Sequence, residues 1–330
     1  MRRFGPLVLR VAAGVVVLGF LVRLVGAAPF VDGLRAVTWP AVVAAVVLTA
    51  LTTLCSAWRW RVVARALGLG IGLWGAVGAY YRSLFLNSVL PGGVVGDVHR
   101  ALTHGRRAGD VARGVRAVGW ERLWGQLIQA VVTVVVLVML PSPVRPALPY
   151  VLAGVAGLVV VVGGVGLLVA GVAGRGRSRL SRTARAAGED LRCQLLAVGV
   201  WPQLVGASVL IVAGHTATFV IAARVAGATV PLGELVALLM VVQIAVVIPL
   251  SIGGWGPREG VAAWAFAAAG LGAAIGVTVA TLYAVLMLAA VTPGAALLLG
   301  DTMRRGRRPD HPDESTQPDQ APQTLESVRG

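Results

Sequence analysis

Two glycine-rich segments of this chain carry charged residues within apolar surroundings, at residues 87–100 and 249–259. Lipid cannot hydrogen-bond unwound backbone, so such segments are tolerated at membrane depth only where protein buries them or where they line a wet cavity. Exposed backbone N–H groups and helix N-termini can bind a phosphate group. We therefore predict a site for a lipid headgroup, and its candidate residues are Asn87, Pro91, Gly92, Gly93, Gly96, Asp97, Arg100, Gly253, Gly254, Gly256, Arg258 and Glu259.

A third charged position, the pair Glu121 and Arg122, stands directly before an apolar run and completes the candidate set. An ionisable side chain at the centre of a bilayer costs about 2.5–3.5 kcal/mol on insertion scales, so these charges must be paired, hydrated or interfacial. Adjacent residues on a helix point in different directions and satisfy one another poorly. We therefore expect crossed pairing, either of Glu121 with Arg258 or of Arg122 with Glu259.

The first segment also has a plainer structural interpretation. Asp97 and Arg100 could form an interfacial i,i+3 ion pair that opens a cytoplasmic helix, with the proline and glycines ending the helix before it. Structural roles are also expected for other polar residues in the apolar runs. His215 is expected to be a hydrogen-bonded core histidine, Gln126, Gln129 and Gln243 are expected to bond between helices, and Trp58, Trp60 and Trp74 are expected to be interfacial anchors.

The composition sets the class of protein in which these residues must be placed. With 57% hydrophobic and only 13% charged residues over 330 positions, the chain is predicted to be a polytopic membrane protein. All 29 basic residues are arginine and the net charge is +15, which suits contact with anionic lipid headgroups. The arginines lie between the apolar runs, as the positive-inside bias produces, so nucleic acid is not expected as a partner.

The apolar runs predict an all-α bundle with about seven or eight spans, because about 20 apolar residues cross the hydrocarbon core as a helix. The shorter run at 74–90 is expected to be a re-entrant element, and residues 253–299, which include a shorter run at 261–272, are expected to enter the membrane and return. The run at 195–225 is long and contains Pro202, so it could instead be two short helices. The predicted spans are 7–27, 38–57, 123–140, 148–173, 195–225, 232–252 and 275–299.

Arginine clusters orient these spans in a cell (cytoplasmic) membrane. Arg2 and Arg3 place the N-terminus in the cytoplasm, and the cluster Arg59, Arg61 and Arg65 follows the second span. The C-terminal tail is expected to be cytoplasmic as well. We divide the chain into a transmembrane domain at 1–303 and a disordered tail at 304–330, whose polar composition cannot bury enough surface to order itself.

Taken in order, the three charged blocks resemble the transmembrane, flippase-like region of lysylphosphatidylglycerol synthases and its stand-alone relatives. The resemblance covers nearly all of residues 5–303. It implies a membrane region that moves lipids between leaflets, whereas aminoacyl transfer belongs to a separate C-terminal cytosolic domain. We therefore expect a stand-alone member without that domain, which could work with a separate lipid-modifying enzyme.

The leading functional hypothesis is a translocase for an anionic phospholipid or a polyprenyl-phosphate-linked lipid, whose phosphate is bound by Arg100, Arg122 or Arg258. One alternative is an integral-membrane transferase acting on a lipid-linked sugar, with Asp97, Glu121 or Glu259 as the base. Another is a non-catalytic scaffold or regulator of lipid or envelope synthesis. No nucleotide-binding run or metal-ligand spacing occurs in the sequence, so we expect no cofactor, and an oligomer is possible.

Overall fold

The computed structural model describes residues 22–90, 93–140, 199–244 and 256–306, together with a few isolated positions between them. Pro91, Gly92, Gly253 and Gly254 lie outside the described residues. So do most of the predicted span 7–27, nearly all of the predicted span 148–173, and the tail beyond residue 306. The principal helices are α2 (Ala28–Arg35), α3 (Trp39–Ala66), α4 (Leu73–Val89), α5 (Val95–Arg107), α6 (Val111–Met139), α9 (Trp201–Val225), α10 (Leu232–Ile244), α11 (Pro257–Ala268), α12 (Ala273–Ala290) and α13 (Pro293–Gly306).

These helices confirm the all-α class, since the described part of the chain contains no strand. Within it, four helices are long and apolar enough to cross a membrane, and α10 is a shorter apolar helix. The four are Trp39–Ala66, Val111–Met139, Trp201–Val225 and Ala273–Asp301, the last running through α12 into α13. The chain is thus a multi-pass membrane protein, while a total of seven or eight spans stays a prediction.

Helix α3 shows how this sequence suits a membrane rather than water. Its exposed face carries large apolar residues, and its buried face carries small and hydroxylated ones. Small and hydroxyl side chains let helices approach closely and bond to one another, whereas large apolar side chains suit lipid. The exposed stripe is Val43, Val47, Leu51, Leu54 and Trp58, and the buried stripe includes Ala41, Ala45, Thr49, Thr52 and Ser56.

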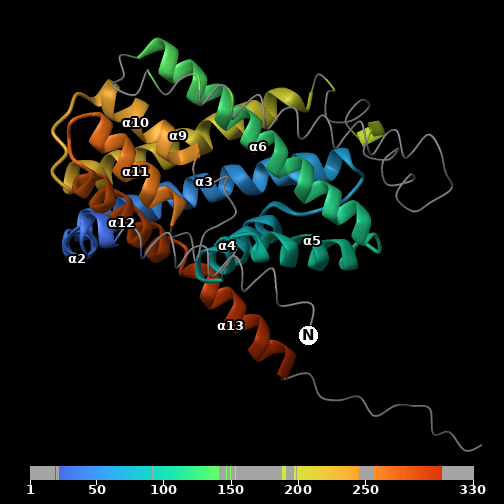
Figure 1. The fold of residues 1–330 in the computed structure, drawn as a ribbon. Helices are drawn as coiled ribbons and strands as arrows, with labels where there is room; N and C mark the ends of the chain where they lie inside the picture. The colour runs from blue at the N-terminus through green and yellow to red at the C-terminus, as the bar shows by residue number, and fades with distance from the viewer. Residues whose placement is uncertain are drawn as a thin grey trace, which may run out of the picture.

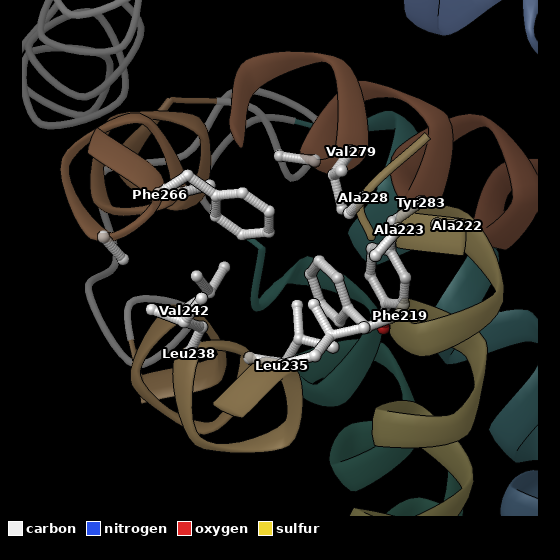
Figure 2. Packing of buried hydrophobic residues seen from close by; sticks show 14 of the residues in the cluster. Phe219, Ala222, Ala223, Ala228, Leu235, Leu238, Val242, Phe266, Val279 and Tyr283 are labelled. Atoms are coloured by element: carbon white, nitrogen blue, oxygen red, sulfur yellow. The ribbon is translucent and has the colours of Figure 1, made fainter. Parts of the chain in front are cut away.

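Helix α3 runs through the bundle and links its two ends (Figure 1). The hairpin of α4 and α5 lies towards its C-terminal end, and α10, α11 and α12 gather towards its N-terminal end (Figure 1). The apolar core is at the latter end, where residues of α9, α10, α11 and α12 pack together (Figure 2). There Phe219 of α9 stacks on Tyr283 of α12, with ring centroids 3.6 Å apart.

Two predicted boundaries are wrong in ways that matter for the site, and one alternative is excluded. The second predicted span ends at 57, yet α3 continues to Ala66, so Arg59 lies inside a helix rather than after it. The predicted span at 123–140 belongs to a helix that starts at Val111, which places Glu121 and Arg122 well inside it. Pro202 lies in the first turn of α9, where a proline is tolerated, and therefore does not divide residues 201–225 into two helices.

Helices α4 and α5 form an antiparallel hairpin that brings the first glycine-rich segment onto α3 and α6. Ser83 lies against Gly96, and Tyr80 lies against Arg100 one turn further along both helices. Gly93 in the connection has a φ of +60°, a conformation that glycine adopts without steric cost. Whether this hairpin re-enters the membrane stays a prediction.

Candidate functional site

Glu121 of α6 is the centre of a buried ion network. Its Oε1 accepts hydrogen bonds from Arg59 Nε at 2.9 Å and from the Tyr80 hydroxyl at 2.8 Å. Its Oε2 accepts a hydrogen bond from Arg100 Nη2 at 2.9 Å. The Glu121 side chain is fully buried, so both carboxylate oxygens are satisfied by protein groups. A buried carboxylate requires such partners because removal from water is otherwise very costly.

Asp97 of α5 extends the network to Arg122 of α6. Its Oδ1 lies 3.1 Å from Arg100 Nη2, and its Oδ2 forms an ion pair with Arg122. The Ser83 hydroxyl and the Asn87 side-chain amide of α4 each donate to Asp97 at 3.1 Å. We call the five charged residues Arg59, Asp97, Arg100, Glu121 and Arg122 the ion network.

The start of α5 is held to α4 by Asn87 and Gly96. The Asn87 side-chain oxygen accepts a hydrogen bond from the Gly96 N–H at 2.7 Å, which satisfies an otherwise unpaired donor in the first turn of α5. A Cβ atom at position 96 would lie only 2.0 Å from the Ser83 carbonyl oxygen. Glycine is therefore required at this position for close packing and not for an exposed anion site.

Arg100 lies between two aromatic rings as well as between two carboxylates. Its Cζ is 4.1 Å from the centroid of the Tyr80 ring and 4.5 Å from that of Trp60. Trp60 is only 1% exposed, so its expected role as an interfacial anchor is wrong, whereas Trp58 and Trp74 are exposed. Stacking of this kind orients a guanidinium group and partly replaces its hydration.

The second charged segment forms its own ion pair. Arg258 Nη2 donates to Glu259 Oε1 at 2.6 Å, and the Gly256 N–H donates to Glu259 Oε2 at 2.6 Å. Arg258 and Glu259 lie in the first turn of α11, where Glu259 caps the helix. The crossed pairing with Glu121 or Arg122 is therefore wrong, because each of these four residues already has a different ionic partner.

A cavity of about 190 Å³ lies between these two charged groups, inside the bundle. It is enclosed by residues of α3, α4, α6, α9, α10 and α12. Many of its lining residues carry polar side chains, although the helices around it are apolar overall. The polar lining includes Arg59, Arg122, Gln126, Ser208, His215 and Gln243. We call this space the membrane cavity.

Hydrogen bonds between helices hold several of these lining residues in place. His215 Nδ1 lies 3.1 Å from the Tyr283 hydroxyl, as expected for a bonded core histidine. Gln243 donates to the Thr216 hydroxyl at 2.9 Å, which confirms its role between α10 and α9. Gln129, by contrast, bonds to Thr133 within α6. Tyr283 also faces the second charged segment, since its ring centroid is 5.2 Å from Arg258 Cζ.

The ion network has one more positive than negative charge, because three guanidinium groups face two carboxylates. Two of the three are almost fully enclosed: the Arg59 side chain is 9% exposed and that of Arg100 is 0% exposed. The Arg122 side chain is 42% exposed and lines the membrane cavity. The excess positive charge is therefore accessible to a ligand at Arg122.

The predicted residues thus divide into two groups. The ion network and its supports contain Asn87, Gly96, Asp97, Arg100, Glu121 and Arg122, whereas Gly256, Arg258 and Glu259 lie on the far side of Tyr283. Sequence reasoning missed Arg59, Tyr80, Ser83, Ser208 and Tyr283. One signal pointed to Arg59: it extends the helical stripe of Thr49, Thr52 and Ser56 by the same spacing of three to four residues.

Comparison with known proteins supplies the family. No curated protein and no solved structure matches the chain. A family model described as the lysylphosphatidylglycerol synthase TM region matches residues 7–294, which include the described helices from α2 to α12. The chain belongs to the family of lysylphosphatidylglycerol synthase transmembrane regions.

Proposed function

We propose that the protein moves an anionic phospholipid or a polyprenyl-phosphate-linked lipid between the leaflets of the cell membrane. The headgroup phosphate enters the membrane cavity and binds Arg122, while the acyl or prenyl tails stay in lipid. The observation that carries the proposal is a cavity between apolar helices that is lined by several polar side chains, among them the partly exposed Arg122 of an ion network with one excess positive charge.

Electrostatics support an anionic rather than a neutral headgroup. A charge surrounded by membrane-spanning helices is costly unless it is paired or hydrated. A phosphate at Arg122 would balance the excess positive charge and accept hydrogen bonds, and Gln126 and Ser208 are further donors on the same walls. The cavity of about 190 Å³ has room for several water molecules or a phosphate group.

In this proposal Arg122 binds the headgroup phosphate, for which the sequence offered three candidate arginines. Arg100 is enclosed by Asp97, Glu121 and two aromatic rings, and Arg258 is bound to Glu259. Neither side chain is as exposed as that of Arg122, and neither lines the membrane cavity. The transferase alternative needs a free carboxylate as a base, and Asp97, Glu121 and Glu259 all accept hydrogen bonds from arginine.

Changing Arg122 to glutamine is expected to slow lipid translocation about tenfold or more, the equivalent of one charge-assisted hydrogen bond lost. The measurement uses purified protein in liposomes and follows equilibration of fluorescently labelled phosphatidylglycerol between leaflets. The matched control is Arg113→Gln, since Arg113 lies on the same helix and its side chain is also 42% exposed. Liposomes that contain the Arg113→Gln variant should translocate the labelled lipid at the rate of the unmodified protein.

Three results would count against this function. Equal translocation rates for the Arg122 variant and the unmodified protein would show that Arg122 does not bind the headgroup. No acceleration over empty liposomes, for either phosphatidylglycerol or a labelled polyprenyl phosphate, would exclude translocation and leave the scaffold alternative. Formation of a modified lipid by the purified protein would favour the transferase.

A further inference from the structure

A second cavity, of about 320 Å³, lies at the other side of the Arg100 guanidinium. It is bordered by the connection between α3 and α4, the start of α4, and α5. The residues that define its character are Gly72, Gly75, Arg82, Arg100, His104 and Arg107. We call this space the hairpin cavity.

The ion network and its aromatic neighbours separate the hairpin cavity from the membrane cavity. Trp60 and Arg100 line the hairpin cavity, whereas Arg59 and Tyr80 line the membrane cavity. Arg59 and Trp60 are consecutive residues of α3 and line different cavities. The two cavities are distinct sites that share one buried wall.

The hairpin cavity is positively charged. Three arginines contribute to its lining, and its described lining residues include no carboxylate. Arg82 also contacts a carboxylate beyond the cavity, with its Nε 3.1 Å from Asp301 Oδ2. The first turn of α4, a helix of 17 residues, places the backbone N–H groups of Gly72 and Gly75 at the cavity, where they have no acceptor within the helix.

Buried donors without a hydrogen-bond partner among the described residues lie in the wall of this cavity. Arg100 is only 2% exposed, yet its Nε and Nη1 have no hydrogen-bond partner among the described residues. The Nε2 atom of His104 is also buried without a partner there. Burial and the nearby Arg107 and Arg100 lower the pKa of His104, so a neutral imidazole can donate from this nitrogen. At Arg100 the rings of Tyr80 and Trp60 partly replace hydrogen-bond acceptors, so the basic lining of the cavity is the main support for an anion site.

We propose that the hairpin cavity binds a phosphate group, as a second anion site beside the membrane cavity. The phosphate belongs either to a small water-soluble phosphate or to a lipid headgroup, since both present the same acceptor oxygens. A volume of about 320 Å³ is within the range of small-molecule sites. This binding does not depend on whether the protein translocates lipid.

The test measures phosphate binding by the full chain and compares neighbouring arginines. Arg106 and Arg107 are both exposed residues near the end of α5, but only Arg107 lines the cavity. The protein is placed in phosphatidylcholine nanodiscs and titrated with inorganic phosphate by calorimetry. We expect Arg107→Gln to weaken binding about tenfold or more, and Arg106→Gln to change it by no more than about twofold.

A second variant fills the hairpin cavity and leaves every charge in place. Gly75 lines the cavity and a Cβ there would meet no atom within 4 Å, so the backbone accepts Gly75→Leu and the larger side chain takes up space at the cavity wall. We expect this variant to lose phosphate binding while keeping the unfolding temperature of the unmodified protein. Arg122→Gln, in the membrane cavity, should leave the phosphate titration unchanged.

A parallel measurement separates the two sources of phosphate. Nanodiscs that also contain phosphatidylglycerol are examined by native mass spectrometry for lipid retained by the protein. The site is assigned to a lipid headgroup if two results are obtained together. Arg107→Gln must lose the retained phosphatidylglycerol, and no variant may give a calorimetric response to inorganic phosphate. A response to inorganic phosphate that Arg107→Gln weakens assigns it to a water-soluble ligand.

The proposal is overturned if Arg106→Gln and Arg107→Gln weaken binding equally, because a diffuse basic surface would then account for it. It is overturned as well if folded Gly75→Leu binds both probes normally, or if neither probe binds the unmodified protein. A failure of lipid translocation would affect none of these titrations, so the two proposals fail separately.

Discussion

Replacing Glu121 by alanine is expected to cost the protein about 3–5 kcal/mol of stability, the usual effect of removing one partner from a buried ion pair. Arg59 and Arg100 would lose the acceptor that they share, and so would the Tyr80 hydroxyl. The excess charge of the ion network would rise from one to two. The measurement is thermal unfolding of purified protein in detergent, with a large decrease in the midpoint as the expected result.

The matched control for this change is Glu234→Ala in the first turn of α10, outside the ion network. It is expected to cost less than about 1 kcal/mol, through the helix dipole alone. Glu121→Gln should lie between the two, since it keeps the side-chain shape but removes the charge. If Glu121→Ala unfolds at the temperature of the unmodified protein, the ion network does not hold α3, α5 and α6 together.

Gly96→Ala is expected to have the second largest effect, because it drives α4 and α5 apart. The added methyl carbon would lie 2.0 Å from the carbonyl oxygen of Ser83 and 2.7 Å from its Cα, and neither backbone atom can move alone. Separation of the hairpin would weaken the hydrogen bonds from Ser83 and Asn87 to Asp97. Arg122 would then lose its oriented partner, so we expect lower stability together with slower translocation.

Gly119→Ala is the control for this steric argument. Gly119 is an exposed residue inside α6, and a Cβ there would meet no atom within 4 Å. Alanine favours a helix over glycine by about 1 kcal/mol, so this variant should unfold at the same or a higher temperature. A Gly96→Ala protein as stable and as active as Gly119→Ala would contradict the close packing of α4 on α5.

Local properties of the chain were readable from sequence. Long apolar runs predict helices that cross a membrane, and α3, α6, α9 and α12 confirm four of them. Boundaries were less predictable, because a helix continues through charged residues when tertiary partners satisfy them. Arg59 appeared to mark the end of a span, but Glu121 and Ser208 bind it inside the bundle.

The sequence predicted many residues of the candidate site but fewer of the contacts between them. Asp97 and Arg100 form the expected i,i+3 pair, which depends only on helical spacing. Arg258 and Glu259 pair with each other although they are neighbours. The Arg258 guanidinium donates to the Glu259 carboxylate, and the same carboxylate caps the first turn of α11. Side-chain length and rotamer decide such a contact, and sequence spacing does not show them.

The sequence alone determined that the protein is helical and membrane-embedded, which family it belongs to, and which short segments carry its charges. These properties follow from composition, apolar run length and motif order, all of which are local. Only the tertiary structure decided which arginine meets which carboxylate and which guanidinium remains accessible. Arg59 is 62 residues from Glu121 in sequence, so their contact depends on how α3 and α6 are rotated and packed, and no local pattern encodes that rotation.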